Sequence, residues 1–193
     1  MKKIMFNDRY GLMQAVIEGR KTMAMMLINI KSTSDVQVRI FAGYVQIIGR
    51  SGDVCAEKKL SYKVGEVVAV AQRYQDIFDY SNCVNPYAWE DDDKPSGWTN
   101  KMLTKAELMP HQIRITGIKC ERLQDISEED CMKEGILGDV EYDKYEVYGL
   151  FGNSDDGFDT PREAFASLID KVSGRGTWKR NPWVVAYEFE LVK

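Results

Sequence analysis

Apolar residues recur at every third or fourth position in separate parts of the chain, and this spacing predicts amphipathic helices. One helix is expected from about Asp8 to Glu18, and another after Thr160, where a proline follows as the first helical residue. A shorter helix is expected between Ser127 and Gly135, because Ser-x-x-acid is a helix start signal and glycine a stop signal. The pattern therefore predicts two or three helices.

Other apolar runs are short and rich in β-branched residues, which is typical of strands. The predicted strands are residues 2–6, 22–28, 67–71, 101–106, 111–119 and 185–191, with a hairpin formed by 36–40 and 44–48. In the last of these strands, alternation predicts that Val185, Tyr187, Phe189 and Leu191 face the core. The elements together predict an α/β (α+β) fold, a mostly antiparallel β-barrel with two or three flanking helices.

Length and composition favour one domain in a cytoplasmic protein. With 193 residues, 44% of them hydrophobic, the chain can bury one core but is short for two ordinary domains. It contains no apolar run that indicates a signal peptide or a membrane span. Residues 76–100 are expected to form a loop, and a loop of this length is a candidate lid or a surface for a protein partner.

The formal net charge of −4 argues against sequence-blind binding of duplex nucleic acid, which depends on many basic contacts to phosphates. Locally, however, Trp178 and Trp183 bracket Lys179-Arg180, an arrangement that suits unpaired bases. The alternative is that both rings belong to the core. The four scattered cysteines and the single histidine form no ligand pattern, so we expect no metal and no cofactor. The acidic run at 90–93 is interpreted as a solvated loop.

The segment Gly19-Arg20-Lys21-Thr22 follows the first predicted helix and resembles the signature of the ASCH domain. That domain is a small β-barrel of the PUA-like superfamily, and its motif runs Gly-x-Lys, then a Thr or Glu, then an Arg. Ala24 and Met26 stand at the positions of the last two. Residues 109–115, 121–130, 134–136 and 181–189 also follow in the order seen in phage-type and bacterial ASCH proteins. The resemblance implies that residues 1–193 form a single ASCH, PUA-like domain, with inserted loops at about 29–62 and 76–100 relative to a minimal domain.

The resemblance also implies a site built from two residues that are far apart in the sequence. In bacterial ASCH proteins that hydrolyse N(4)-acetylcytidine, the lysine of the motif and a distant glutamate are catalytic, and Lys21 and Glu134 match them. Because Ala24 replaces the threonine, the nucleophile would have to be water or Thr22. Glu134 is expected at a helix end, where the macrodipole opposes a carboxylate. The alternative for Glu134 is a solvated surface position.

Further residues are candidates for holding a base, because aromatic rings stack on bases and an amide can read a base edge. The candidate ligand-binding residues are Gly19, Arg20, Thr22, Tyr74, Trp98, Arg114, Asn181 and Trp183. For each aromatic residue, a core position is the alternative. Three functions stay open: binding of RNA or a modified nucleoside, hydrolysis of an acylated nucleoside, and protein interaction in a phage or mobile element.

Overall fold

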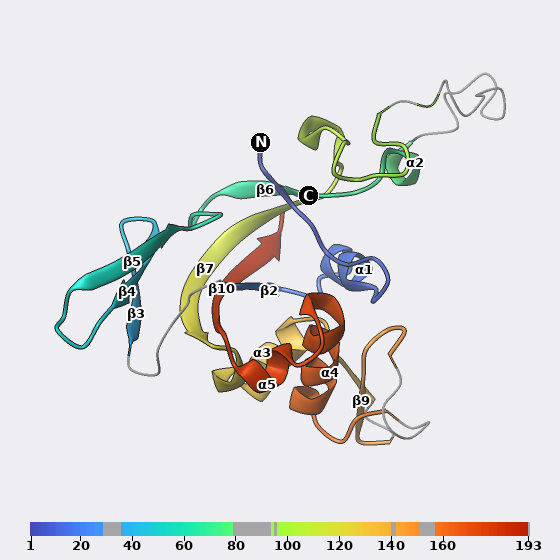
Figure 1. Cartoon of the computed structure of the whole chain (residues 1–193). Coiled ribbons are helices and arrows are strands. Elements are labelled where there is room, and N and C mark those ends of the chain that lie inside the picture. The colour runs from blue at the N-terminus through green and yellow to red at the C-terminus, as the bar shows by residue number, and fades with distance from the viewer. Residues whose placement is uncertain (29–35, 79–93, 95, 140–141, 151–156, 193) are drawn as a thin grey trace.

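A computed structural model describes residues 1–28, 36–78, 94, 96–139, 142–150 and 157–192. In these residues the chain forms ten strands in three sheets, together with five α-helices and two short 3-10 helices (Figure 1). The predicted α+β class is confirmed. No helix of this described part is long and apolar enough to cross a membrane.

The largest sheet has five strands in the order β1-β6-β7-β10-β2. The bounds of these strands are β1 (Lys3–Ile4), β2 (Met23–Leu27), β6 (Val67–Val70), β7 (Gln112–Arg122) and β10 (Trp183–Leu191). β1 runs parallel to β6, and the other neighbouring strands pair antiparallel, as predicted. The outer strands β1 and β2 are not paired with each other in the described sheet. The sheet is therefore open there, and the closed barrel stays a prediction.

A second sheet lies beside the main one, on the side away from α1 and α4 (Figure 1). Its strands are β3 (Gln37–Phe41), β4 (Tyr44–Ile48) and β5 (Val54–Lys59). The predicted hairpin is confirmed as β3 and β4, which are joined through the left-handed residues Ala42 and Gly43. The hydrophobic pattern does not predict β5, because every residue of this strand is exposed and no apolar alternation marks it.

The remaining elements are short except for one helix. They are α1 (Leu12–Ile17), α2 (Tyr74–Ile77), α3 (Glu128–Lys133), α4 (Pro161–Ser173), α5 (Thr177–Arg180), the 3-10 helices η3 (Ala106–Leu108) and η4 (Leu123–Asp125), and the strand pair β8 (Leu137–Asp139) and β9 (Lys144–Glu146). The sequence pattern does not predict α2, α5, β8 or β9, because three or four residues are too few to show a period.

The start signals of two helices act as predicted. The Ser127 hydroxyl accepts a hydrogen bond from the Asp130 N–H of α3, and the Thr160 hydroxyl accepts one from the Glu163 N–H of α4, each at 3.1 Å. α1 begins later than the predicted Asp8, because Gly11 takes a left-handed conformation with φ 62° directly before it. Helical residues cannot continue through such a conformation.

The predicted strand at 101–106 is wrong: these residues form turns that lead into η3. Their backbone oxygens are satisfied by a side chain instead of by a strand. The Lys3 ammonium donates to the carbonyl oxygens of Met102 and Thr104, each at 2.7 Å. Charge-assisted hydrogen bonds from Lys3 thus take the place of the backbone hydrogen bonds between strands that the local pattern predicts.

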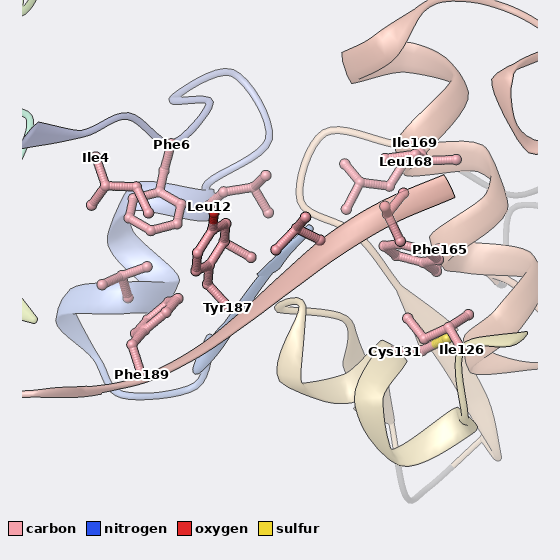
Figure 2. Packing of buried hydrophobic residues seen from close by; sticks show 14 of the residues in the cluster. Ile4, Phe6, Leu12, Ile126, Cys131, Phe165, Leu168, Ile169, Tyr187 and Phe189 are labelled. Atoms are coloured by element: carbon pink, nitrogen blue, oxygen red, sulfur yellow. The ribbon is translucent and has the colours of Figure 1, made fainter. Parts of the chain in front are cut away.

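The main core fills the space between the five-stranded sheet and α4. Figure 2 shows Tyr187 between Phe6 and Phe165. Val185, Tyr187 and Phe189 are buried as predicted, but Leu191 is 38% exposed because β10 extends there beyond the covering elements. The opposite face of β10 is also covered in part, since Ala186 is fully buried.

Replacing Thr160 by alanine should lower the free energy of unfolding by about 1 kcal/mol, because α4 loses the hydroxyl that caps its first turn. Urea denaturation monitored by circular dichroism measures this change. The matched control is Thr99→Ala, at an exposed threonine outside any helix, which should alter stability by less than about 0.5 kcal/mol. Equal effects of the two replacements would contradict a capping role for Thr160.

Candidate functional site

Lys21 lies at the corner between α1 and β2. Gly19 follows α1 in a left-handed conformation, with φ 73°, and the Lys21 N–H then donates to the Ala15 carbonyl oxygen at 2.9 Å. The backbone at this corner is thereby fixed, and the Lys21 side chain is turned inward, where the residue is only 2% exposed. A buried lysine of this kind requires a partner.

Glu134 comes to the same place from the other direction, at the C-terminal cap of α3. The Thr22 N–H donates to the Lys133 carbonyl oxygen at 2.9 Å, so the end of α3 is bonded to the residue after Lys21. Glu134 is 5% exposed. Its interpretation as a solvated surface residue is therefore wrong, because tertiary packing covers this helix end.

The side chains of Lys21 and Glu134 form a buried ion pair. The Lys21 ammonium donates to Glu134 Oε2 and, at 2.8 Å, to the backbone carbonyl oxygen of Glu134. The prediction that these residues meet at one site is confirmed, although 113 positions separate them. The ammonium also resolves the electrostatic conflict at this helix end, since it compensates both the carboxylate and the C-terminal end of the helix dipole.

Two further contacts complete the surroundings of the pair. The Lys21 Nζ lies 5.8 Å from the centre of the Phe6 ring, within the range of a cation–π interaction. Glu134 Oε1, the second carboxylate oxygen, is buried and accepts no hydrogen bond from any described residue. The pair is thus neutral overall but keeps one unused acceptor.

A pocket of about 150 Å³ opens beside the ion pair. Its walls include the two members of the pair, Ala24 and Met26 of β2, the polar residues Asn7 and Ser173, and apolar residues of the N-terminal segment and α4. They are Ile4, Met5, Phe6, Asn7, Leu12, Lys21, Ala24, Met25, Met26, Glu134, Phe165, Leu168, Ile169, Val172 and Ser173. Figure 2 shows Ile4, Phe6 and Leu12 facing Phe165, Leu168 and Ile169 across this region.

The sequence predicts the Lys21 and Glu134 pair but does not predict that residues of α4 and Phe6 line a pocket beside it. α4 carries a clear apolar face, yet that pattern alone predicts only burial and gives no sign of a cavity. Val172 is 42% exposed because it lies near the end of α4, where it lines the pocket. Phe6 belongs to a predicted strand but lies beyond the end of β1.

The other motif residues at the corner have structural contacts and do not line the pocket. Arg20 is turned outward, where it pairs with the exposed Glu18. Thr22 contributes backbone groups, since its carbonyl oxygen accepts from the Phe189 N–H at 2.9 Å. Of the two candidate nucleophiles, the structure therefore does not bring Thr22 to the pocket.

Three of the remaining candidates lie away from this site. Tyr74 and Trp98 pack edge-on against each other, with their ring centres 5.9 Å apart. Arg114 lies on β7 between the buried residues Ile113 and Ile115, so its side chain points to the other face of the sheet. There it forms an exposed ion pair with Glu190 at 2.9 Å. None of these three residues lines the pocket beside Lys21.

Asn181 and the two tryptophans near it are also structural neighbours of the core. Asn181 adopts a left-handed conformation, and its side-chain oxygen accepts from the Gln124 N–H at 2.8 Å. Trp178 packs edge-on against Phe165, and Trp183 lies under the Arg122 guanidinium at 4.5 Å. The alternative of core positions for these rings is thus supported, and none of the three residues lines the pocket.

α3 is held against the sheet by a second set of charges. Burial alone would raise the pKa of Asp130, but hydrogen bonds from Lys119 and Lys133 outweigh it and hold that pKa below its usual value. Burial raises the pKa of the neighbouring Cys131 thiol to about 12. Cys131 is therefore protonated at neutral pH and is not an activated nucleophile beside Glu134.

In the described parts of the chain, no group of three or more His, Cys, Asp or Glu side chains is arranged to hold a metal ion. The acidic run at 90–93 lies outside these parts. The arrangement beside Lys21 offers one neutral ion pair, one carboxylate oxygen and apolar walls. It can bury a small apolar body and exchange a hydrogen bond or a proton with it at one point.

Comparisons with known proteins leave the family of this chain open. No family model matches the sequence, and no curated protein matches it. Among solved structures, the chain is similar to a crystal structure of a protein from Enterococcus faecalis described under family DUF984. The two share 14% sequence identity at a TM-score of 0.42, over 100% of this chain and 76% of the other.

Replacing either partner of the buried pair alone, by Lys21→Met or Glu134→Gln, should cost about 3–5 kcal/mol of unfolding free energy, because the other charge stays buried without a counter-ion. The double variant should cost clearly less than the sum. Urea denaturation of all four proteins measures the coupling.

The exposed pair of Arg114 and Glu190 is the matched control, and the corresponding cycle there should give a coupling below about 1 kcal/mol. Additive costs at Lys21 and Glu134 would show that the ion pair is not a stabilising unit.

Proposed function

We propose that this chain binds RNA or a modified nucleoside by holding one base in the pocket beside Lys21 and Glu134. The observation that carries the proposal is the convergence of Lys21, Ala24, Met26 and Glu134, all singled out by the ASCH resemblance, on the walls of one pocket. Random placement of a lysine and a glutamate 113 positions apart would not produce a buried pair there. The PUA-like barrel that the resemblance implies belongs to the same proposal.

The size of the pocket favours a ligand that buries a single ring. Its volume of about 150 Å³ matches that of an apolar cavity able to take up a benzene molecule. Pockets for drug-sized ligands are larger, at about 300–1,000 Å³. A single base ring would therefore enter, and the sugar and phosphate groups would stay outside.

The charge distribution supports recognition of the base over recognition of phosphate. The family motif has an arginine where this chain has Met26, and a thioether side chain cannot bind phosphate as a guanidinium does. Lys21 is already occupied by Glu134. Affinity would then come from ring burial and from a few contacts, which agrees with the acidic net charge of −4.

Hydrolysis of an acylated nucleoside is the second candidate, and the contact between Lys21 and Glu134 favours it. Because Ala24 has no hydroxyl and Thr22 does not line the pocket, water would have to attack the acyl carbon. Glu134 Oε1 would accept the proton of that water and then donate it to the leaving nitrogen as the C–N bond breaks. Lys21 would hold the other carboxylate oxygen in place throughout.

Protein interaction through the loop at 76–100, in a phage or mobile-element setting, is the third proposal. Most of that segment, 79–93 and 95, lies outside the described residues. Lys101 directly follows the segment. Its ammonium donates to the carbonyl oxygen of Phe6, a residue that lines the pocket, and at 2.8 Å to the Asp8 carboxylate.

A panel of nucleosides and short single-stranded RNAs should contain at least one compound that raises the melting temperature, since a ligand that binds only the folded state stabilises it. Ala24→Leu should abolish that rise by filling the pocket. Ala56→Leu, at an exposed alanine on β5, is the control and should keep it. A panel without any stabilising compound, or an undiminished rise in Ala24→Leu, would contradict base binding in this pocket.

The unaltered protein should show little or no hydrolysis of N(4)-acetylcytidine, and Ala24→Thr with Met26→Arg should gain activity by restoring the hydroxyl and the cation of the motif. Chromatographic detection of cytidine measures turnover. Ala24→Val with Met26→Arg is the matched control, because valine has the shape of threonine without its hydroxyl. Rapid turnover by the unaltered chain would show that the hydroxyl is dispensable.

A further inference from the structure

The cation of the pocket is already engaged by Glu134. Among the residues that line the pocket, Lys21 and Glu134 are the charged ones. The Lys21 ammonium has three N–H donors, and two of its contacts go to the Oε2 and backbone oxygen atoms of Glu134. The Phe6 ring lies on a further side at 5.8 Å. A ligand in the pocket therefore meets Glu134 more readily than the Lys21 ammonium.

The carboxylate, in contrast, is incompletely used. Glu134 Oε1 is buried and has no hydrogen-bond donor among the described residues. A buried acceptor without a partner is destabilising, and more so when it is charged. Asn7 and Ser173 also line the pocket, but neither side chain donates a hydrogen bond to Glu134 Oε1.

We infer that the pocket selects an uncharged single ring that carries an N–H or O–H donor, and that this donor binds Glu134 Oε1. Lys21 is then a positioning residue, which acts on the ligand through Glu134. The inference rests on the proposed function only in taking this pocket as the binding site. It names the chemical class of the ligand, which base binding alone leaves open.

The same geometry excludes two other classes of ring. A ring with acceptors only would face the carboxylate oxygen with its own lone pairs and leave Glu134 Oε1 unsatisfied. An anionic ring would meet a carboxylate at the wall and no unpaired cation among the lining residues. Methionine at position 26 adds polarisable apolar surface and no donor.

The test compares aniline with toluene, because the two rings have nearly the same shape and differ in an amine against a methyl group. Isothermal titration or ligand-detected NMR on the full chain should show aniline binding at least about tenfold more tightly, the ratio expected for one hydrogen bond to a charged acceptor. Benzoate, the anionic ring, should bind more weakly than both.

Glu134→Gln should invert the preference. The amide oxygen would turn to the Lys21 ammonium and present the amide N–H₂ to the pocket, so pyridine, an acceptor ring, should then bind more tightly than aniline. If that variant does not fold, Lys21→Met with Glu134→Gln removes both charges and should reduce the preference for aniline over toluene to below about threefold. Glu129→Gln, on the exposed side of α3, is the control and should keep the tenfold preference.

Toluene binding as tightly as aniline, benzoate binding best, or no binding of either ring would overturn the inference. These outcomes are separable from the fate of the proposed function. Nucleosides that stabilise the protein whether or not their base carries an N–H or O–H donor would contradict the inference but would agree with base binding. A clear preference for aniline, in a protein that no nucleoside or RNA stabilises, would support the donor-selective pocket and refute base binding.

Discussion

The buried ion pair between Lys21 and Glu134 is the constraint on which the arrangement of this site depends. It joins the corner after α1 to the end of α3, two segments that are 113 positions apart. A buried pair is weak as a source of net stability, because desolvation offsets its attraction, but it is costly to break. The pair therefore fixes where these two segments meet more than it strengthens the fold.

The apolar residues around this pair limit what it can do. Ala24 and Met26 form part of an apolar wall, and Phe165 and Leu168 of α4 line the same pocket. In such surroundings a carboxylate oxygen without a partner becomes the main polar feature. Ala24 and Met26 provide neither a hydroxyl nor a guanidinium group. The apolar walls and the Glu134 carboxylate are suited to binding a small ring.

Several candidate residues do not line the pocket beside Lys21. Arg114 and the aromatic residues Tyr74, Trp98 and Trp183 were reasonable ligand contacts by residue type. Each has a structural partner instead, since Arg114 pairs with Glu190 on the outer face and the rings pack against other side chains. Residue type indicates which interactions are possible, and only the fold decides which of them face a cavity.

The α+β class, the capped starts of α3 and α4, and the first hairpin can be predicted from the sequence alone, because they follow from local periodicity and from hydrogen bonds within a few residues. Lys21 and Glu134 can also be found from the sequence, but through a resemblance and not through any local rule. That α4 and Phe6 line a pocket beside them, and that residues 101–106 form no strand, can be seen only in the folded chain. Those features depend on contacts between distant segments, such as Lys3 with Thr104, which no local pattern encodes.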